Sequence, residues 1–154
     1  MFQRLAQKTQ GLLLIALLSS GAAVNASTGD AEAGQVKAAT CVACHGVDGN
    51  SAVPTFPKLA GLGHKYLLKQ MQDIRDGRRP VALMAGQVDN MTDEDLSDIA
   101  AFYDAQERSG GMSDPDKVAL GRKVYLAGIA DRQVPACSGC HSPTGNGNSL
   151  AGYP

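Results

Sequence analysis

Residues 63–77, GHKYLLKQMQDIRDG, have the hydrophobic spacing of an amphipathic helix. Leu67, Met71 and Ile74 recur at intervals of three or four positions, which places them on one helical face. Gly77 follows the last of them and is a typical C-terminal stop, because glycine adopts the left-handed conformation without strain. We therefore predict a helix that ends just before Gly77 and buries one apolar face.

A second helix is predicted within residues 92–106, TDEDLSDIAAFYDAQ. Thr92 is a suitable N-cap, and the acidic residues after it complement the positive end of the helix dipole. Met91, directly before the cap, is expected to pack as a hydrophobic staple. The apolar stripe has the i, i+3, i+4, i+7 pattern and consists of Leu96, Ile99, Ala100 and Tyr103.

The rest of the chain repeats one pattern twice. Residues 31–61 and residues 117–154 each begin with a helix-favouring stretch that contains one glycine, and each then reaches Cys-x-x-Cys-His. A loop rich in glycine and asparagine follows, and after it an aromatic residue and a proline. In the second copy, residues 126–136 precede the motif and are predicted to form a loop, because they contain Gly128 and Pro135.

The pattern predicts an all-α protein with two unequal domains. Residues 27–106 are expected to form a complete first domain, and residues 107–116, rich in Gly, Ser and Pro, a linker. Residues 117–154 are expected to form the N-terminal part of a second domain, which stops at the point that matches Pro57.

Residues 1–26 have the pattern of a secretory signal peptide. Arg4 and Lys8 precede the apolar run at residues 11–18, and small residues lead to a cleavage site after Ala26. The apolar run is far shorter than the roughly 20 residues of a membrane span, so an uncleaved anchor is the weaker alternative. We predict export through the secretory pathway and removal of residues 1–26.

The composition of the mature chain excludes some functions and limits its core. Without the two basic residues of the signal peptide it has 12 basic and 15 acidic residues, and this net charge of −3 does not suggest nucleic-acid binding. Aromatic residues make up only 5% of the sequence, and there is no Trp. Small domains of this kind commonly complete their core with disulfides, a metal or a cofactor.

All four cysteines belong to the two motifs, and four interpretations compete for them. A disulfide framework, a four-thiolate zinc site and a thioredoxin-like pair all use Cys-x-x-Cys. The thioredoxin-like pair needs a strand–helix unit around it, and the sequence has no visible strand pattern. Neither the disulfide framework nor the zinc site requires a histidine directly after the second cysteine in both copies. Covalent c-type haem does, because the two sulfurs bond the haem vinyl groups and the histidine binds iron. We therefore predict thioether links at Cys41, Cys44, Cys137 and Cys140.

In this interpretation His45 and His141 are the proximal iron ligands, and the second axial position of the first haem remains to be assigned. The candidates are His64, Met71, Met84, Met91 and Met112. Met71 and Met91 are expected in the core, Met112 lies in the linker, and His64 is most simply a solvated residue at a helix start. Met84 lies in a loop outside any apolar stripe, where its thioether can approach the haem, and it is the preferred ligand.

The segments GDAEAGQVKAATCVACHGVDGNSAVPTFPKLAG, YLLKQMQDIRDG and MTDEDLSDIAAFY closely resemble the dihaem cytochromes c4, and the resemblance extends over residues 29–154. It implies two class-I cytochrome c domains, each with one covalently bound haem c. It also implies that Met84 is the first distal ligand and that the carbonyl of Pro57 holds the proximal His45 ring. The Gly34 helix would pack against the helix of Leu96–Tyr103.

The resemblance ends where the chain ends. Family members continue through a second Met loop and a final helix, whereas no Met follows His141 here. The sequence is then either a fragment of a longer product or a truncated natural version. We favour the fragment, because half a haem pocket would expose a large apolar face to water.

These features favour a soluble periplasmic electron shuttle of a respiratory chain that docks transiently on redox partner proteins. A cytochrome subunit of a dehydrogenase complex is the alternative, and a haem peroxidase is disfavoured by Met84 at the first iron. Peripheral membrane association stays open. Basic residues gather before Met84, and acidic residues gather within residues 89–107, as docking patches or as solvated helix faces. The basic set is Lys65, Lys69, Arg75, Arg78 and Arg79.

The covalent attachment can be tested on the purified protein. After denaturation and extraction with acidified organic solvent, we expect the red colour to stay with the polypeptide, because thioether bonds survive this treatment. Absorbance of the two phases measures the partition. Pigment in the solvent phase would contradict the interpretation.

Overall fold

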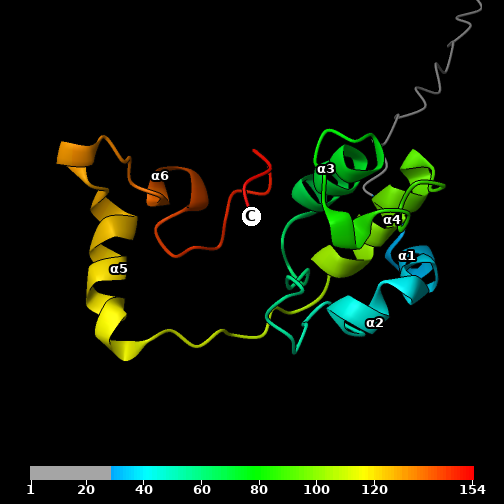
Figure 1. Ribbon diagram of the computed structural model, residues 1–154, viewed down its shortest axis with the longest axis horizontal. Coiled ribbons are helices and arrows are strands. Elements are labelled where there is room, and N and C mark those ends of the chain that lie inside the picture. Colours follow the sequence, from blue (N-terminus) through cyan, green and yellow to red (C-terminus); the bar gives the residue numbers. More distant parts are fainter. Residues whose placement is uncertain (1–28) are drawn as a thin grey trace, which may run out of the picture.

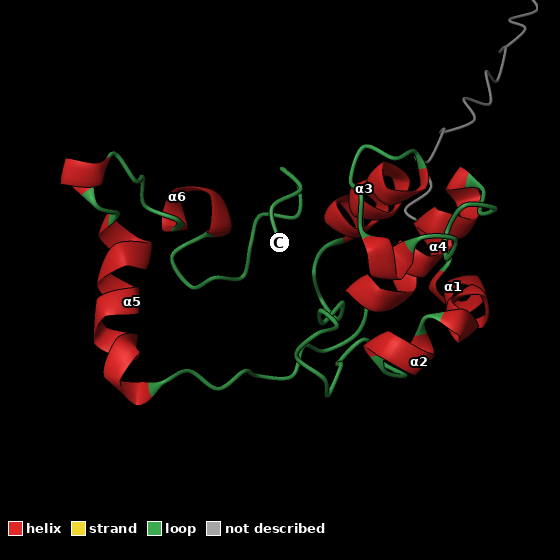
Figure 2. Ribbon diagram, in the orientation of Figure 1, coloured by secondary structure: helices red, strands yellow, loops and turns green. Residues whose placement is uncertain are grey.

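A computed structural model describes residues 29–154, and the predicted signal peptide lies outside these residues. The described residues are helical, with no β-strand beyond two isolated bridges (Figure 2). None of their helices is both long and apolar enough to cross a membrane. In chain order the elements are α1 (Ala31–Lys37), η1 (Ala38–Thr40), α2 (Val42–His45), α3 (His64–Arg75), η2 (Ala82–Met84), α4 (Asp93–Asp104), α5 (Pro115–Ala127), η3 (Ala130–Arg132) and α6 (Ser138–His141).

The first unit is built on the crossing of α1 and α4 (Figure 1). At the crossing Gly34 meets the backbone of α4 so closely that a Cβ atom would lie 1.9 Å from the carbonyl oxygen of Asp98. The predicted stripe of α4 is buried, since its members Leu96, Ile99, Ala100 and Tyr103 are at most 1% exposed. The predicted contact between these two helices is confirmed.

A buried carboxylate ties the same two helices together. Asp98 accepts a hydrogen bond from the Asp30 amide at 2.7 Å and one from Lys37 Nζ at 2.6 Å. Lys37, at the end of α1, also pairs with Asp95 at 2.9 Å. The bond from Lys37 and the bond from the Asp30 amide hold the pKa of Asp98 below its ordinary value.

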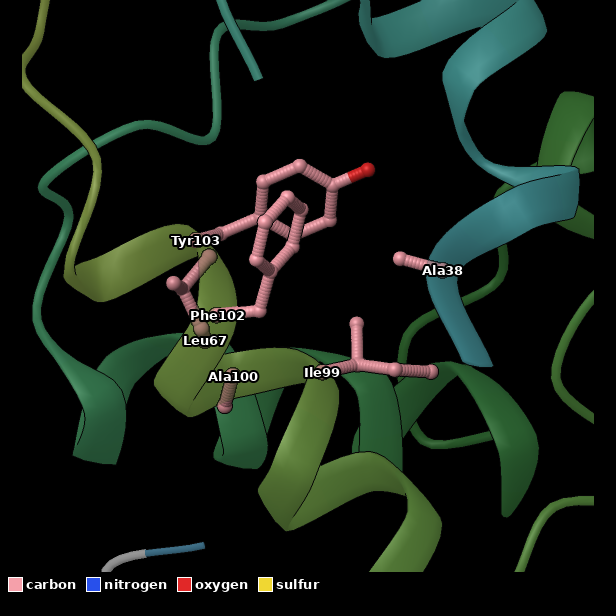
Figure 3. Packing of buried hydrophobic residues seen from close by; sticks show 6 residues of the cluster. All are labelled: Ala38, Leu67, Ile99, Ala100, Phe102 and Tyr103. Carbon is pink, nitrogen blue, oxygen red and sulfur yellow. The ribbon is translucent and has the colours of Figure 1, made fainter. Parts of the chain in front are cut away.

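Helix α3 lies against α4 and completes the core (Figure 3). Leu67 is buried in the cluster, Met71 packs against it, and Gly77 has φ +74° just beyond the helix end. The expectation for His64 was wrong. Its side chain is half-buried, and its Nε2 lies 3.1 Å from the carbonyl oxygen and 3.0 Å from the hydroxyl of Ser97, because it fills the contact between α3 and α4.

The second unit contains the same early elements with far less burial. Helix α5 starts at Pro115, within the segment predicted as linker, and none of its residues is buried. The loop predicted at residues 126–136 is partly ordered, since Leu126 and Ala127 belong to α5 and η3 follows. A bridge between Ile129 and Val134 closes this loop before α6.

Two glycines at corresponding positions test the helix crossing. In Gly34→Ala the new methyl group collides with the α4 backbone, and we expect a loss of at least about 2 kcal/mol of unfolding free energy. In Gly121→Ala no described atom outside the neighbouring backbone of α5 itself lies within 4 Å of the new Cβ, so we expect a gain of roughly 0.5–1 kcal/mol from helix propensity. Urea unfolding followed by circular dichroism measures both, and equal stability of the two variants would contradict the packing account.

Candidate haem attachment sites

The first motif forms a single helical turn at the end of the α1–η1 segment. Cys41 caps α2, and the amides of Cys44 and His45 donate to the Cys41 carbonyl oxygen at 3.2 and 2.9 Å. Both cysteines have free thiols. The turn therefore offers two sulfur nucleophiles and an imidazole within five consecutive residues, which is the arrangement that thioether attachment and iron ligation require.

The side chain of His45 is oriented by one backbone carbonyl. His45 is only 7% exposed, and its Nδ1 lies 2.8 Å from the carbonyl oxygen of Pro57. Because a carbonyl oxygen only accepts hydrogen bonds, Nδ1 carries the hydrogen and Nε2 keeps its lone pair. Phe56 packs edge-on against the imidazole with ring centroids 6.3 Å apart. The ring is thus held in the tautomer and orientation of a metal ligand.

The second motif repeats this geometry. Cys137 caps α6, and His141 Nδ1 lies 2.8 Å from the carbonyl oxygen of Pro154. Tyr153 takes the place of Phe56, with ring centroids 5.7 Å apart. The Tyr125 hydroxyl of α5 donates to the carbonyl oxygens of His141 and Ser142, at 3.1 and 2.6 Å. The imidazole–carbonyl contact is therefore present in both copies.

The structure does not bring the two cysteine pairs together. Residues 29–154 contain no disulfide, and no group of three or more potential His, Cys, Asp or Glu metal ligands is gathered within them. The four-thiolate zinc site and the disulfide framework therefore lack support in the arrangement of the four cysteines.

The methionines of the first unit and the linker differ in burial and packing. Met71 and Met91 pack against the core cluster, as predicted, and Met112 is fully exposed in the linker. Met84 ends η2, is half-buried and takes no part in the core cluster. Among the methionines of the described residues, Met84 is therefore the one that lies neither against the core cluster nor in the linker.

The surroundings of Cys41 fit an additional apolar group. Cys41 packs against the core beside partly buried leucines, and burial raises the pKa of its thiol. Tyr103 is 1% exposed, yet its hydroxyl has no well-formed hydrogen bond within residues 29–154, although the Cys41 thiol is close enough to influence its pKa. Figure 3 shows this hydroxyl directed toward the segment that carries Ala38. The buried Tyr103 hydroxyl, without a hydrogen-bond partner beside Cys41, is consistent with a haem that packs against these residues.

Comparison with known proteins identifies the class. The family model described as "Cytochrome c" matches residues 31–104. The crystal structure of reduced recombinant cytochrome c4 from Pseudomonas stutzeri superposes with a TM-score of 0.79 at 52% identity, over 82% of this chain and 71% of that one. The described residues therefore have the helical class-I cytochrome c fold, as predicted.

Two curated relatives place the chain more closely. The cytochrome c4 of Pseudomonas aeruginosa is 56% identical over 128 residues, which are 83% of this chain and 64% of that protein. The thiosulfate dehydrogenase electron acceptor of Thiomonas intermedia is 31% identical over 134 residues, 84% of this chain and 62% of that protein. The chain belongs to the cytochrome c4 family, and it spans about two thirds of the length of the curated members it matches. Its two Cys-x-x-Cys-His motifs are sites of covalently bound haem c.

Proposed function

We propose that this chain is a periplasmic electron carrier of a respiratory chain, with one haem c in each unit. The single observation that carries the proposal is the repeated contact between a motif histidine and a proline carbonyl, at 2.8 Å in both units. Family membership and the predicted signal peptide support it. The proposed domains are residues 27–106 and residues 115–154, joined by residues 107–114, because α5 begins at Pro115.

In this proposal His45 would hold the first haem iron as its proximal ligand and Met84 as its distal ligand, and His141 would be the proximal ligand of the second. Pro57 accepts the Nδ1 hydrogen of His45, which fixes the ring and makes Nε2 a stronger donor. The bound haem supplies the one-electron chemistry of its iron. A His/Met pair leaves no open axial position for substrate and favours electron transfer over oxygen chemistry.

The charges of α3 and of the turn that follows it favour a docking surface with little net positive potential. Lys69 pairs with Asp73, and Arg78 bonds both Asp73 and Asp76. Arg75 pairs with Asp76 and with Asp93 of α4 at 2.9 Å. Three of the five clustered basic residues are thus balanced by neighbouring acids, which favours the solvated-face interpretation of this cluster.

Apolar side chains provide the alternative docking contacts. Val47 lies two residues after His45 of the first motif and is 74% exposed. Leu83 directly precedes Met84 and is 65% exposed. Small apolar contacts beside a redox centre suit the transient partners of an electron carrier, whose interfaces are of the small, weak class. We therefore propose redox proteins as partners, with a modest contribution from charge.

A cytochrome subunit of a dehydrogenase complex is the second candidate. The observation in its favour is the similarity to the thiosulfate dehydrogenase electron acceptor. Purification at fixed stoichiometry with a larger catalytic subunit would favour it over a free shuttle.

Electron carriage without catalysis can be measured by protein-film voltammetry. We expect reversible one-electron waves in buffer, and no catalytic current at the potential of the first haem when hydrogen peroxide or thiosulfate is added, because its proposed His/Met ligation leaves no position for substrate. A catalytic current with peroxide would contradict the carrier proposal in favour of a peroxidase. A catalytic current with thiosulfate would contradict it in favour of a dehydrogenase.

The distal ligand can be tested with matched methionine variants. Met84→Ala is expected to abolish the long-wavelength Met–iron charge-transfer band and to lower the reduction potential of the first haem, because the thioether stabilises ferrous iron. Met112→Ala removes an exposed thioether from the linker and should leave both unchanged. Optical spectra and redox titration measure the two effects. Survival of the band in Met84→Ala would show that another residue is the ligand.

A further inference from the structure

The start of the linker is hydrogen-bonded to the first unit by the side chain of Asn50. Asn50 Nδ2 donates to the carbonyl oxygen of Glu107 at 2.9 Å, and Asn50 Oδ1 accepts from the amide of Ser109 at 2.8 Å. One side-chain amide thus satisfies two backbone groups of the linker, much as a neighbouring strand would. This contact joins residues that are 57 and 59 positions apart in the chain.

The orientation of the Asn50 amide is determined by Asp48. Asn50 Nδ2 also donates to Asp48 Oδ2 at 2.9 Å, and the Asn50 backbone amide donates to Asp48 Oδ1 at 2.9 Å. These bonds hold the pKa of Asp48 below its ordinary value, so it is a carboxylate that only accepts. The NH₂ group of Asn50 must therefore face Asp48 and Glu107, which leaves Oδ1 for Ser109.

Two basic side chains complete the attachment from opposite directions. Lys58 Nζ donates to the Ser109 hydroxyl at 2.6 Å and to the carbonyl oxygens of Ser109 and Gly110 at 3.1 and 3.3 Å. Arg108 reaches back from the linker, with Nε on the Ala60 carbonyl oxygen at 3.0 Å and Nη2 on that of Gly61 at 2.8 Å. Neither side chain has a carboxylate partner in these contacts. Both donate to backbone carbonyl oxygens, and Lys58 donates to the Ser109 hydroxyl as well.

We propose that Asn50, Lys58 and Arg108 form a linker clamp that fixes where the second unit leaves the first and so sets the separation of the two haem sites. This proposal rests on the proposed function, in that the separation matters for electron exchange between two haems. Tunnelling between redox centres slows steeply as their distance grows, so a carrier with two centres benefits from a restricted linker.

The clamp shortens the part of the linker that is free to vary. As a flexible coil, residues 107–114 would have a root-mean-square span of roughly 16 Å, whereas residues 111–114 alone would span roughly 11 Å. Beyond the clamp, Lys65 Nζ donates to the Leu150 carbonyl oxygen at 2.8 Å and provides a contact between the units. The linker runs from the clamp to α5 without further helical structure (Figure 1). The clamp and this contact hold the second unit at two separate points.

The second motif provides a matched control. Asn146 follows Cys140 by the same number of residues as Asn50 follows Cys44. The Asn146 side chain is exposed and makes no hydrogen bond within residues 29–154. Asn146→Ala therefore removes the same chemical group from an equivalent loop without touching the clamp.

The clamp is tested on the full haem-loaded chain with Asn50→Ala, Lys58→Met and the double variant. We expect amide exchange at Ser109 to accelerate at least tenfold and the interatomic distance distribution from small-angle X-ray scattering to broaden. The spectrum of the first haem should stay unchanged, because none of these residues contacts His45 or Met84 in the hydrogen bonds described. Asn146→Ala should match the wild type in every readout.

Three outcomes would overturn the proposal. Ser109 exchange as slow as in the wild type would mean that the bonds do not hold the linker. Faster exchange with an unchanged scattering profile would mean that the clamp does not position the second unit. Equal broadening in Asn146→Ala would make the effect nonspecific. Exchange and scattering need no electron transfer, so a wild type that fails to carry electrons would contradict the proposed function alone.

Discussion

The close approach of Gly34 to the carbonyl of Asp98 is the constraint on which the first unit depends. It lets α1 cross α4 at backbone contact, and the chain then continues through η1 directly into the cysteine motif. Any larger residue would move this segment away from Tyr103 and the core. The position of both thiols and of His45 is therefore set by a helix crossing several residues upstream.

The proximal sides of the two sites are more alike than the units that contain them. In each, one helical turn presents the histidine, and a proline carbonyl 12 or 13 residues later orients it. The same histidine–proline contact is present in the second unit, where α5 precedes the motif as α1 does in the first. The burial of His45 depends on the first unit, because that unit supplies the surrounding core.

Hydrogen bonds and ion pairs in this molecule mostly organise its own backbone. Lys58 and Arg108 bind carbonyl oxygens of the opposite segment. Lys37 neutralises Asp98 at the contact of α1 and α4, and Arg78 neutralises Asp73 just after the end of α3. Because these charged groups are already paired within the chain, they stabilise its conformation more than they attract a partner protein. Val47 and Leu83 are exposed apolar side chains, and in the proposed carrier they would contribute to small, transient docking contacts.

The sequence alone determined the features that depend on local chemistry. The two Cys-x-x-Cys-His motifs, the Thr92 cap, the Leu96–Tyr103 stripe and the end of α3 near Gly77 follow from spacing and backbone preference within a few residues. Tertiary structure decided what depends on distant pairs. His64 looked solvated because its partner Ser97 lies on another helix. The hydrogen bonds of the linker could not be predicted, because Asn50 is 57 positions from Glu107. The sequence does not indicate which distant backbone groups a polar side chain will bind. The periodicity of apolar residues, by contrast, directly indicates which face of a helix is buried.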